Sequence, residues 1–483
     1  MTAKALIICL DSASPLLLKR WMAEGALPNL RTLQANGTGG HITTPLGMGD
    51  DCVWASFYTG LPVGHHGRYF WAQLDADAGK VTHAADRLPE APPLWMQLSR
   101  AGMRIAALDV PKIAVARELN GIQLCDWLVH GRDYPTPQSY PADLAAFVTA
   151  EFGDAPASIC SETIPPLSDM LIAEVSRNLL QSVHMKRRCA QHFLKADDWD
   201  LFVVAFKEAH CGTHSLWHLV DHSDPSHIPG MDRRLGEPLK AVYRALDDAL
   251  GELIAEAGPD CSILVFSSLG MGRNHTGNHL LDQIVSRINT RMGPLGARSY
   301  GRLIALLHKL DLGNHADRYS TRTICRALPH NEVSGAIRLN VAGRDPGGPI
   351  QFGADYDNLC ETLDGALRAL ESPQTGRRIV AQVIKTRNAF SGPKVDNLPD
   401  LFVVWDRAAP ISSACSPLLG RLEAGTLPNL RRGNHVSGGS FVVSGPASAV
   451  WASGQESQID QILGQFLNAS GLRCPKPPSG NFP

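Results

Sequence analysis

The chain has 483 residues, of which 44% are hydrophobic and 19% are charged, so it is long enough to bury a large core. Its 45 basic and 47 acidic residues give a formal net charge of -2, without the basic excess by which nucleic-acid-binding proteins neutralise phosphates. These values exclude a dedicated nucleic-acid partner and favour an ordinary globular protein.

The N-terminal apolar run, residues 5–10, is far shorter than that of a signal peptide and is closed by Asp11. No other stretch approaches the roughly 20 apolar residues needed to cross a bilayer. The 11 cysteines are scattered and include no Cys-x-x-Cys pair, which indicates reduced thiols. We therefore expect a cytoplasmic protein with no membrane partner, and leave a homodimer open as its assembly.

Six short apolar runs are predicted strands of a mostly parallel sheet, because they are apolar on both faces rather than alternating. In chain order they are 5–10, 105–108, 201–206, 262–266, 401–405 and 441–444. Helix-like patterns occur at 15–35, 93–101, 170–194 and 237–257. This alternation predicts an α/β fold with helices on both faces of the sheet.

Residues 291–348 differ from the rest, being rich in Arg, Asn, Gly and His with weaker periodicity. We predict that they form an inserted cap or lid whose Arg and Lys residues select the substrate. The catalytic core would then comprise residues 1–290 and 349–472. The proline-rich end, residues 473–483, cannot form regular structure and is a predicted flexible tail.

Polar residues follow three of the predicted strands at or near their carboxyl ends. Asp11 follows the first, Glu208 and His210 follow the third, and Ser268 follows the fourth. In α/β sheets, ligands bind beyond the carboxyl ends of the strands. Because histidine is the commonest neutral ligand of zinc-type metals, the sequence predicts a metal site at this edge.

His210 and His214 have the spacing His-x-x-x-His, which places both imidazoles on one face if the segment turns into a helix. His435 precedes a predicted strand in a glycine-rich turn. Together the three would offer three neutral nitrogens and an open fourth position, as in catalytic zinc sites. The alternative for each is a hydrogen-bonded histidine of the core.

A set of short motifs occurs in a fixed order along most of the chain. It comprises residues 10–13, 24–30, 53–60 with Pro62 and 66–67, then 214–217, 270–272, 399–401, and 433–435 leading to 445–446. The set resembles the type I phosphodiesterase/nucleotide pyrophosphatase family of the alkaline phosphatase superfamily. The resemblance implies an alkaline-phosphatase-like three-layer sandwich with a mostly parallel sheet, a site for two divalent metals, and a phosphodiester or nucleotide-like substrate.

The resemblance also implies specific site residues, and this chain departs from several of them. Asp11 is the implied ligand of one metal, and the implied Thr or Ser nucleophile is replaced by Asp50. An implied Asp-His pair before Gly270 is Ser268-Leu269, and an implied Asp ligand of the second metal is His210. Because the Asp11 side has lost two ligands, we expect one divalent ion rather than two, with zinc favoured.

Asp50 has several alternative roles. It can act as a general base or as an attacking carboxylate, or it can join Asp51 in binding magnesium or manganese. Both can also be inert turn residues, and Asp11 can simply cap the following helix. The weaker metal candidates are Glu208, Asp51 and His279, with His275 ranked below His279.

We predict a metal-dependent hydrolase of small phosphate esters, with Asp50 as its catalytic residue and Asp11, His210, His214 and His435 as its metal residues. One alternative is a non-hydrolytic or biosynthetic enzyme on the same scaffold, because a fold does not fix its chemistry. Another is a catalytically silent relative that binds a ligand. A dinucleotide site, a sulfatase and a serine hydrolase are disfavoured, because their sequence signatures are missing.

Overall fold

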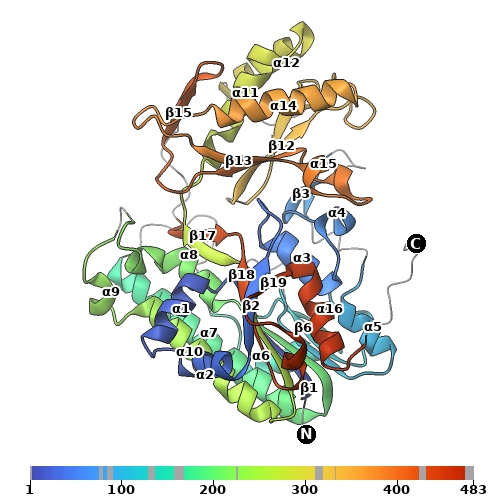
Figure 1. Ribbon diagram of the computed structural model, residues 1–483, viewed down its shortest axis with the longest axis vertical. Helices are drawn as coiled ribbons and strands as arrows, with labels where there is room; N and C mark the ends of the chain where they lie inside the picture. Colours follow the sequence, from blue (N-terminus) through green and yellow to red (C-terminus); the bar gives the residue numbers. More distant parts are fainter. Residues whose placement is uncertain are drawn as a thin grey trace.

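The computed structural model describes residues 3–75, 80–83, 91–128, 136–156, 168–224, 227–309, 319–331, 333–423 and 431–473. The predicted tail lies outside these residues except for Arg473. The lower part of the molecule is built on a large sheet with helices on both sides, and the upper part is built on a smaller sheet of its own (Figure 1).

The large sheet has nine strands in the order β19-β2-β18-β9-β1-β8-β5-β6-β7. They are β1 (Ala3–Leu10), β2 (Thr38–Thr43), β5 (Ile105–Leu108), β6 (Gly121–Cys125), β7 (Gln138–Tyr140), β8 (Trp199–Phe206), β9 (Ser262–Ser267), β18 (Gly439–Ser444) and β19 (Gln455–Gln458). The run from β9 to β6 is parallel, whereas β18 is antiparallel to β9 and β2, and β7 to β6. The predicted mostly parallel α/β fold is confirmed.

Helices cover both faces of this sheet (Figure 1). One face carries α1 (Pro15–Ala23), α2 (Pro28–Asn36), α7 (Asp169–Ala196), α8 (Glu208–Val220) and α10 (Pro238–Ala257). The other carries α3 (Asp50–Thr59), α5 (Leu94–Arg100) and α16 (Ile459–Ala469). Leu6 and Ile8 of β1 enter the first core and Ile7 enters the second, which explains why this strand is apolar on both faces.

One predicted helix, residues 15–35, is in fact two. The structure divides it into α1 and α2 at Gly25, whose φ of +75° lies in the left-handed region that glycine adopts readily. Pro28 then starts α2, in agreement with the preference of proline for the first helical turn.

The upper part contains a four-stranded antiparallel sheet in the order β11-β12-β14-β13. Its strands are β11 (Cys325–Leu328), β12 (Ser334–Leu339), β13 (Val380–Lys385) and β14 (Leu401–Trp405). The helices α11 (Leu281–Met292), α12 (Leu295–Lys309) and α14 (Ala354–Arg368) lie beside it (Figure 1). The strand predicted at 401–405 therefore exists, but its assignment to the large parallel sheet was wrong.

The burial of β14 gives the physical reason for this error. Leu401, Val403 and Trp405 pack into the core formed with the helices of the upper part, whereas Phe402 packs with Met48 of the lower part. Both faces of β14 are therefore buried, and its sequence has the uninterrupted apolar character expected of a parallel strand.

The predicted cap, residues 291–348, supplies α12, β11 and β12 of the upper part. The remaining strands of the same sheet, β13 and β14, come from residues 380–405, which were assigned to the core. The domain boundaries stay a prediction. An apolar cluster that includes Tyr69 and Phe70 from below and Leu328 and Phe402 from above joins the two parts.

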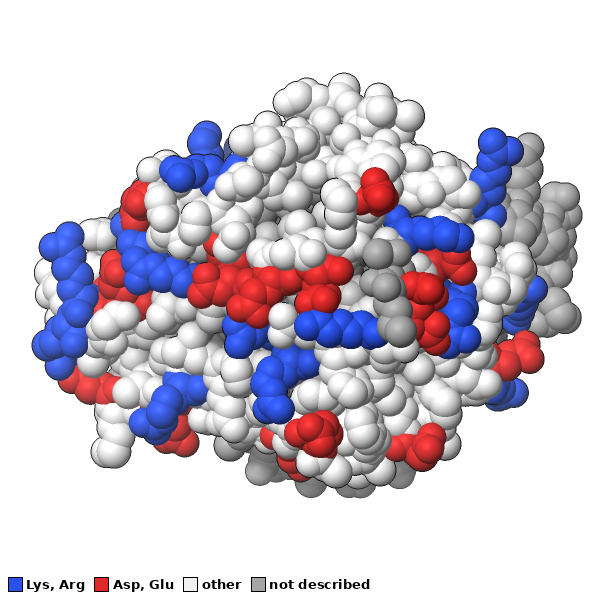
Figure 2. Space-filling view, turned by 90° about the horizontal axis from the view of Figure 1, so that it is seen from below, with Lys and Arg blue, Asp and Glu red and all other residues white. Residues whose placement is uncertain are grey.

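Among the described residues, no helix combines the length and apolar character that a bilayer crossing requires. The face seen from below carries acidic and basic side chains next to one another (Figure 2). This face therefore offers no uniformly basic surface of the kind that binds a nucleic-acid backbone.

Candidate metal centre

The site lies at the carboxyl ends of β1 and β8. These strands pair in parallel with Leu10 opposite Phe206, and the Asp11 amide donates a hydrogen bond to the Phe206 carbonyl at 2.8 Å. Helix α8 begins at Glu208, so His210 and His214 lie one turn apart on a helix, as their spacing required.

His435 reaches the same place from β17 (Gly433–Val436), which pairs antiparallel with β10 (Gly270–Arg273). The segment before it is attached to α8, because the Arg432 amide donates to the His214 carbonyl at 2.7 Å. A Cβ on Gly433 would lie 2.6 Å from the carbonyl oxygen of Thr213, so this close approach requires glycine.

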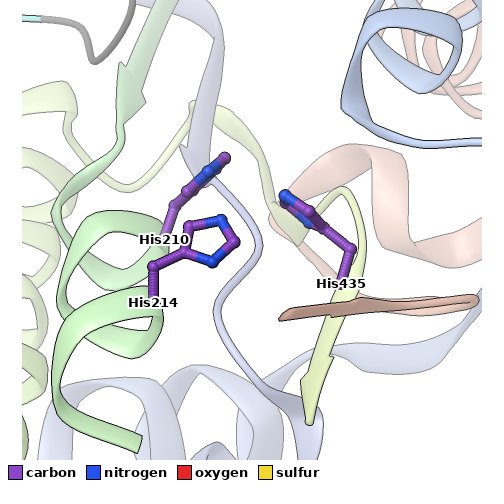
Figure 3. Close-up of side chains that lie close together, drawn as sticks. All are labelled: His210, His214 and His435. Carbon is purple, nitrogen blue, oxygen red and sulfur yellow. The ribbon is translucent and has the colours of Figure 1, made fainter. Parts of the chain in front are cut away.

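The three imidazoles face one another (Figure 3). One ring nitrogen from each of His210, His214 and His435 lies within 4.8 Å of the others. The ring centroids are 4.6 to 5.0 Å apart, and the residues are 1%, 0% and 3% exposed. The structure thus brings together three histidines from two distant segments, and their role as metal ligands stays a prediction.

Hydrogen bonds orient two of the rings. His214 donates from Nδ1 to the Gly433 carbonyl at 2.7 Å, and His210 pairs through Nδ1 with Oδ2 of Asp11 at 2.9 Å. In each ring the neutral form then has its lone pair on Nε2. Histidines that bind metals commonly donate their other nitrogen to a carbonyl or carboxylate, so these residues fit a transition-metal ion.

Burial favours the neutral form of the His435 imidazole, which is the form that binds metals. Burial lowers the pKa of His435 to about 3, and the positive charge of His210 adds to this effect. The carboxylates of Asp50 and Asp11 oppose it, but they do not outweigh burial.

Asp11 is fully buried and its oxygens are used by protein groups. Oδ2 faces His210, while Oδ1 accepts from Ser268 Oγ at 2.7 Å, Trp54 Nε1 at 3.2 Å and Ser12 Oγ at 3.3 Å. Burial alone raises the pKa of this carboxyl, but the charge and hydrogen bond of His210 hold it well below its ordinary value. The geometry favours an orienting role for Asp11 over direct coordination.

Asp50 is the first residue of α3 and is 8% exposed. Burial raises the pKa of its carboxyl, but the positive charges of Lys112 and then of His435 and His210 hold the pKa well below its ordinary value. The carboxylate therefore stays ionised within electrostatic reach of the histidines. A helix N-terminus also stabilises negative charge.

Two weaker metal candidates have carboxylates that contact other side chains of the protein. Oδ1 of Asp51 lies 3.3 Å from an Arg68 guanidinium nitrogen and 3.6 Å from Nζ of Lys112. Oε1 of Glu208 accepts from Ser182 Oγ at 2.6 Å and lies 3.7 Å from Nζ of Lys186. Among the described residues, neither carboxylate belongs to the histidine group.

His275 and His279 are also separate from this group in the part of the chain that the structure describes. His275 donates from Nδ1 to the Arg407 carbonyl at 2.9 Å. His279 lies in the short 3-10 helix η2 (Asn278–Leu280), and burial lowers its pKa. Whether either residue replaces the missing Asp-His pair stays a prediction.

The sequence reasoning missed Lys207, which is 1% exposed and directly follows β8. The rule that selected Asp11 and His210, a polar residue after a strand, would also have selected it. The sequence reasoning also missed that residues of the upper part lie next to the segment that precedes Asp50. A Cβ on Gly49 would overlap Nδ2 of Asn331, and His330 pairs through Nε2 with the Gly47 carbonyl at 2.8 Å.

Residues 5–344 match the model of the family described as type I phosphodiesterase / nucleotide pyrophosphatase. No curated protein matches the chain.

Similar solved structures include phosphonoacetate hydrolase from Sinorhizobium meliloti in complex with phosphonoformate, with a TM-score of 0.54, 14% identity, and 97% of this chain and 95% of that chain covered. Murine ectonucleotide pyrophosphatase / phosphodiesterase 5, an inactive form in complex with AMP, has a TM-score of 0.53 and 14% identity, with 99% of this chain and 98% of that chain covered. The human counterpart has a TM-score of 0.51 and 12% identity, with 99% of this chain and 97% of that chain covered. At these identities the likeness establishes the fold.

Proposed function

Because the chain belongs to the type I phosphodiesterase / nucleotide pyrophosphatase family and is a phosphoester hydrolase, we propose that it works with one divalent metal, zinc, held by His210, His214 and His435. The family is metal-dependent and acts on small phosphorylated substrates such as nucleotides. The further specifications, namely one ion, its identity as zinc, and these three ligands, are our own.

One observation carries the proposal: the three buried imidazoles have ligand atoms within 4.8 Å of one another. A core histidine gains nothing from two imidazole neighbours, since burial makes the charged form of each costly. Asp11 and the Gly433 carbonyl fix the rings at Nδ1, so the cluster is arranged before a ligand arrives.

A bound divalent ion supplies Lewis-acid polarisation of a phosphoryl oxygen. The chain's own contribution is to hold charge in place. Asp50, kept ionised by Lys112, supplies a carboxylate with two possible roles. It attacks phosphorus, which breaks the ester P–O bond, releases the alcohol and leaves an acyl phosphate that water then hydrolyses, or it takes the proton of the water that displaces the alcohol directly. Phosphoryl transfer depends mainly on such positioning and charge stabilisation.

The substrate we propose is a small phosphodiester or nucleotide-like ester. The murine neighbour was solved with AMP and the bacterial neighbour with a phosphonate, and both ligands are consistent with a substrate that carries a phosphoryl group. Residues of the upper part that approach Gly47 and Gly49, namely His330 and Asn331, would contact the rest of the substrate.

The test is elemental analysis of the full chain purified without chelator, followed by assays with aryl phosphodiesters and monoesters. We expect one equivalent of zinc, and turnover that a chelator removes and zinc restores. His214→Ala should lose both metal and turnover.

The matched control is His218→Ala, one turn further along the same helix and also buried. It lies outside the histidine group and should keep its metal. Wild-type protein that binds no stoichiometric divalent metal under metal-replete conditions would overturn the proposal, as would equal metal loss in both variants.

A further inference from the structure

We propose that the Lys207 ammonium is the anion-binding group of this site, which receives a negatively charged oxygen of the substrate's phosphoryl group beside the metal. The inference deepens the proposed function and rests on it for the nature of the anion. It concerns a lysine whose ammonium has no ion pair within the part of the chain that the structure describes.

The position of Lys207 follows from the backbone. It comes directly after β8 and directly before α8, three positions before His210. Because Phe206 lies opposite Leu10, Lys207 and Asp11 leave the sheet side by side at its carboxyl edge. This is the edge at which α/β proteins bind their ligands.

The partners of Lys207 are the second observation. The residue is only 1% exposed, yet among the described residues no carboxylate lies within 4 Å of its Nζ and no hydrogen bond engages that atom. An ammonium in a nearly enclosed position without a direct partner is costly, and proteins retain such a group where a ligand completes it.

Lys186 is a second buried lysine, and its ammonium has direct partners within the protein. It lies on α7 close to the same strand end, and its Nζ is 2.9 Å from Asp109, 2.9 Å from the Ala205 carbonyl and 3.7 Å from Glu208. The two lysines are equally buried. The contrast indicates that Lys186 has a structural role and that the ammonium of Lys207 binds an anion.

The charges of the site agree with this role. The positive charge of Lys207 helps to lower the pKa of both Asp11 and Asp50, so its ammonium lies within electrostatic reach of both carboxylates. A lysine ammonium binds phosphate as a compact point charge, which suits an anion held beside a metal ion.

The test measures binding of inorganic phosphate to the full chain by calorimetry, with and without added zinc. We expect Lys207→Met to weaken phosphate binding about 10- to 100-fold, the range for a charged hydrogen bond, while metal content stays unchanged. Lys207→Arg should recover most of the affinity. The affinity of the wild type should fall with added salt more steeply than that of Lys207→Met.

Lys186→Met is the matched control, because it also removes a buried ammonium near the same strand end. It should lower the melting temperature more than Lys207→Met, yet leave phosphate affinity within about twofold in the folded protein. If Lys207→Met does not fold, Lys207→Gln replaces it.

Phosphate affinity equal to wild type in a folded Lys207 variant would overturn the inference, as would a wild type that binds no phosphate at millimolar concentration. Absence of zinc in the wild type would instead overturn the proposed function. In that case a Lys207-dependent phosphate affinity would still support the inference.

Discussion

The two sides of the site differ in what their polar atoms are used for. On the histidine side, His210 and His214 each use Nδ1 for a protein contact and have Nε2 for a ligand. On the aspartate side, both oxygens of Asp11 accept hydrogen bonds, and Ser268 stands where a ligand pair is implied by the family resemblance. One side is arranged to coordinate an ion and the other to hold that arrangement in place.

This difference explains why we propose one metal ion rather than two. A second ion beside Asp11 would have to replace the hydrogen bonds from Ser268 and Trp54 and would lie near the ammonium of Lys207. Both changes are unfavourable, since buried polar groups need their partners and like charges repel.

The largest effect is expected on the histidine side. His214→Ala removes one of three neutral ligands, so the ion and its Lewis-acid contribution of several kcal/mol are lost together. We expect kcat/KM to fall on the order of 10⁴-fold, measured with an aryl phosphodiester at saturating zinc. Activity within tenfold of wild type would contradict this assignment, because the histidine side would then not be the catalytic one.

Asp50→Asn is expected to have the next largest effect, on the order of 10³-fold in kcat, within the range for general acid–base catalysis. Zinc content should remain at the wild-type value, because this residue stands outside the histidine group. Hydroxylamine trapping during turnover separates the two roles: a trapped adduct at residue 50 indicates attack, and its absence indicates proton acceptance. An active Asp50→Asn enzyme would remove Asp50 from the mechanism.

The histidine group was predictable from the sequence because each residue carried a local signal. His210 and His214 had helical spacing after a strand, and His435 lay in a glycine-rich turn before one. Their meeting in space was an inference, and the pairing of β10 with β17 places His435 beside the other two histidines.

The weaker ligand candidates could not be sorted in the same way. Glu208 and Asp51 have equally suggestive positions, but their bonds to Ser182 and Arg68 come from residues distant in sequence. The place of β14 was equally hidden, because burial by the helices of the upper part and burial in a parallel sheet give the same apolar pattern.

Asp11→Asn tests the aspartate side and should have an intermediate effect. An amide can still contact His210 but cannot hold its ring as a carboxylate does, so we expect zinc affinity to fall about 10- to 100-fold, as for other outer partners of metal-binding histidines. Competition with a chromogenic chelator measures this. Complete loss of zinc, equal to that in His214→Ala, would show that Asp11 coordinates the ion directly.

Ser268→Ala should have the smallest effect, because Oδ1 of Asp11 keeps its bond from Trp54. We expect a loss of about 1 kcal/mol in the free energy of unfolding and a change of only a few fold in zinc affinity. Ser182→Ala, which removes the equally short bond to Glu208, is the matched control. It should destabilise the protein to a similar extent without changing zinc affinity, since Glu208 stands outside the histidine group in the part of the chain that the structure describes. If the two variants alter zinc affinity equally, the effect comes through α8 as a whole, and Asp11 has no special part in holding His210.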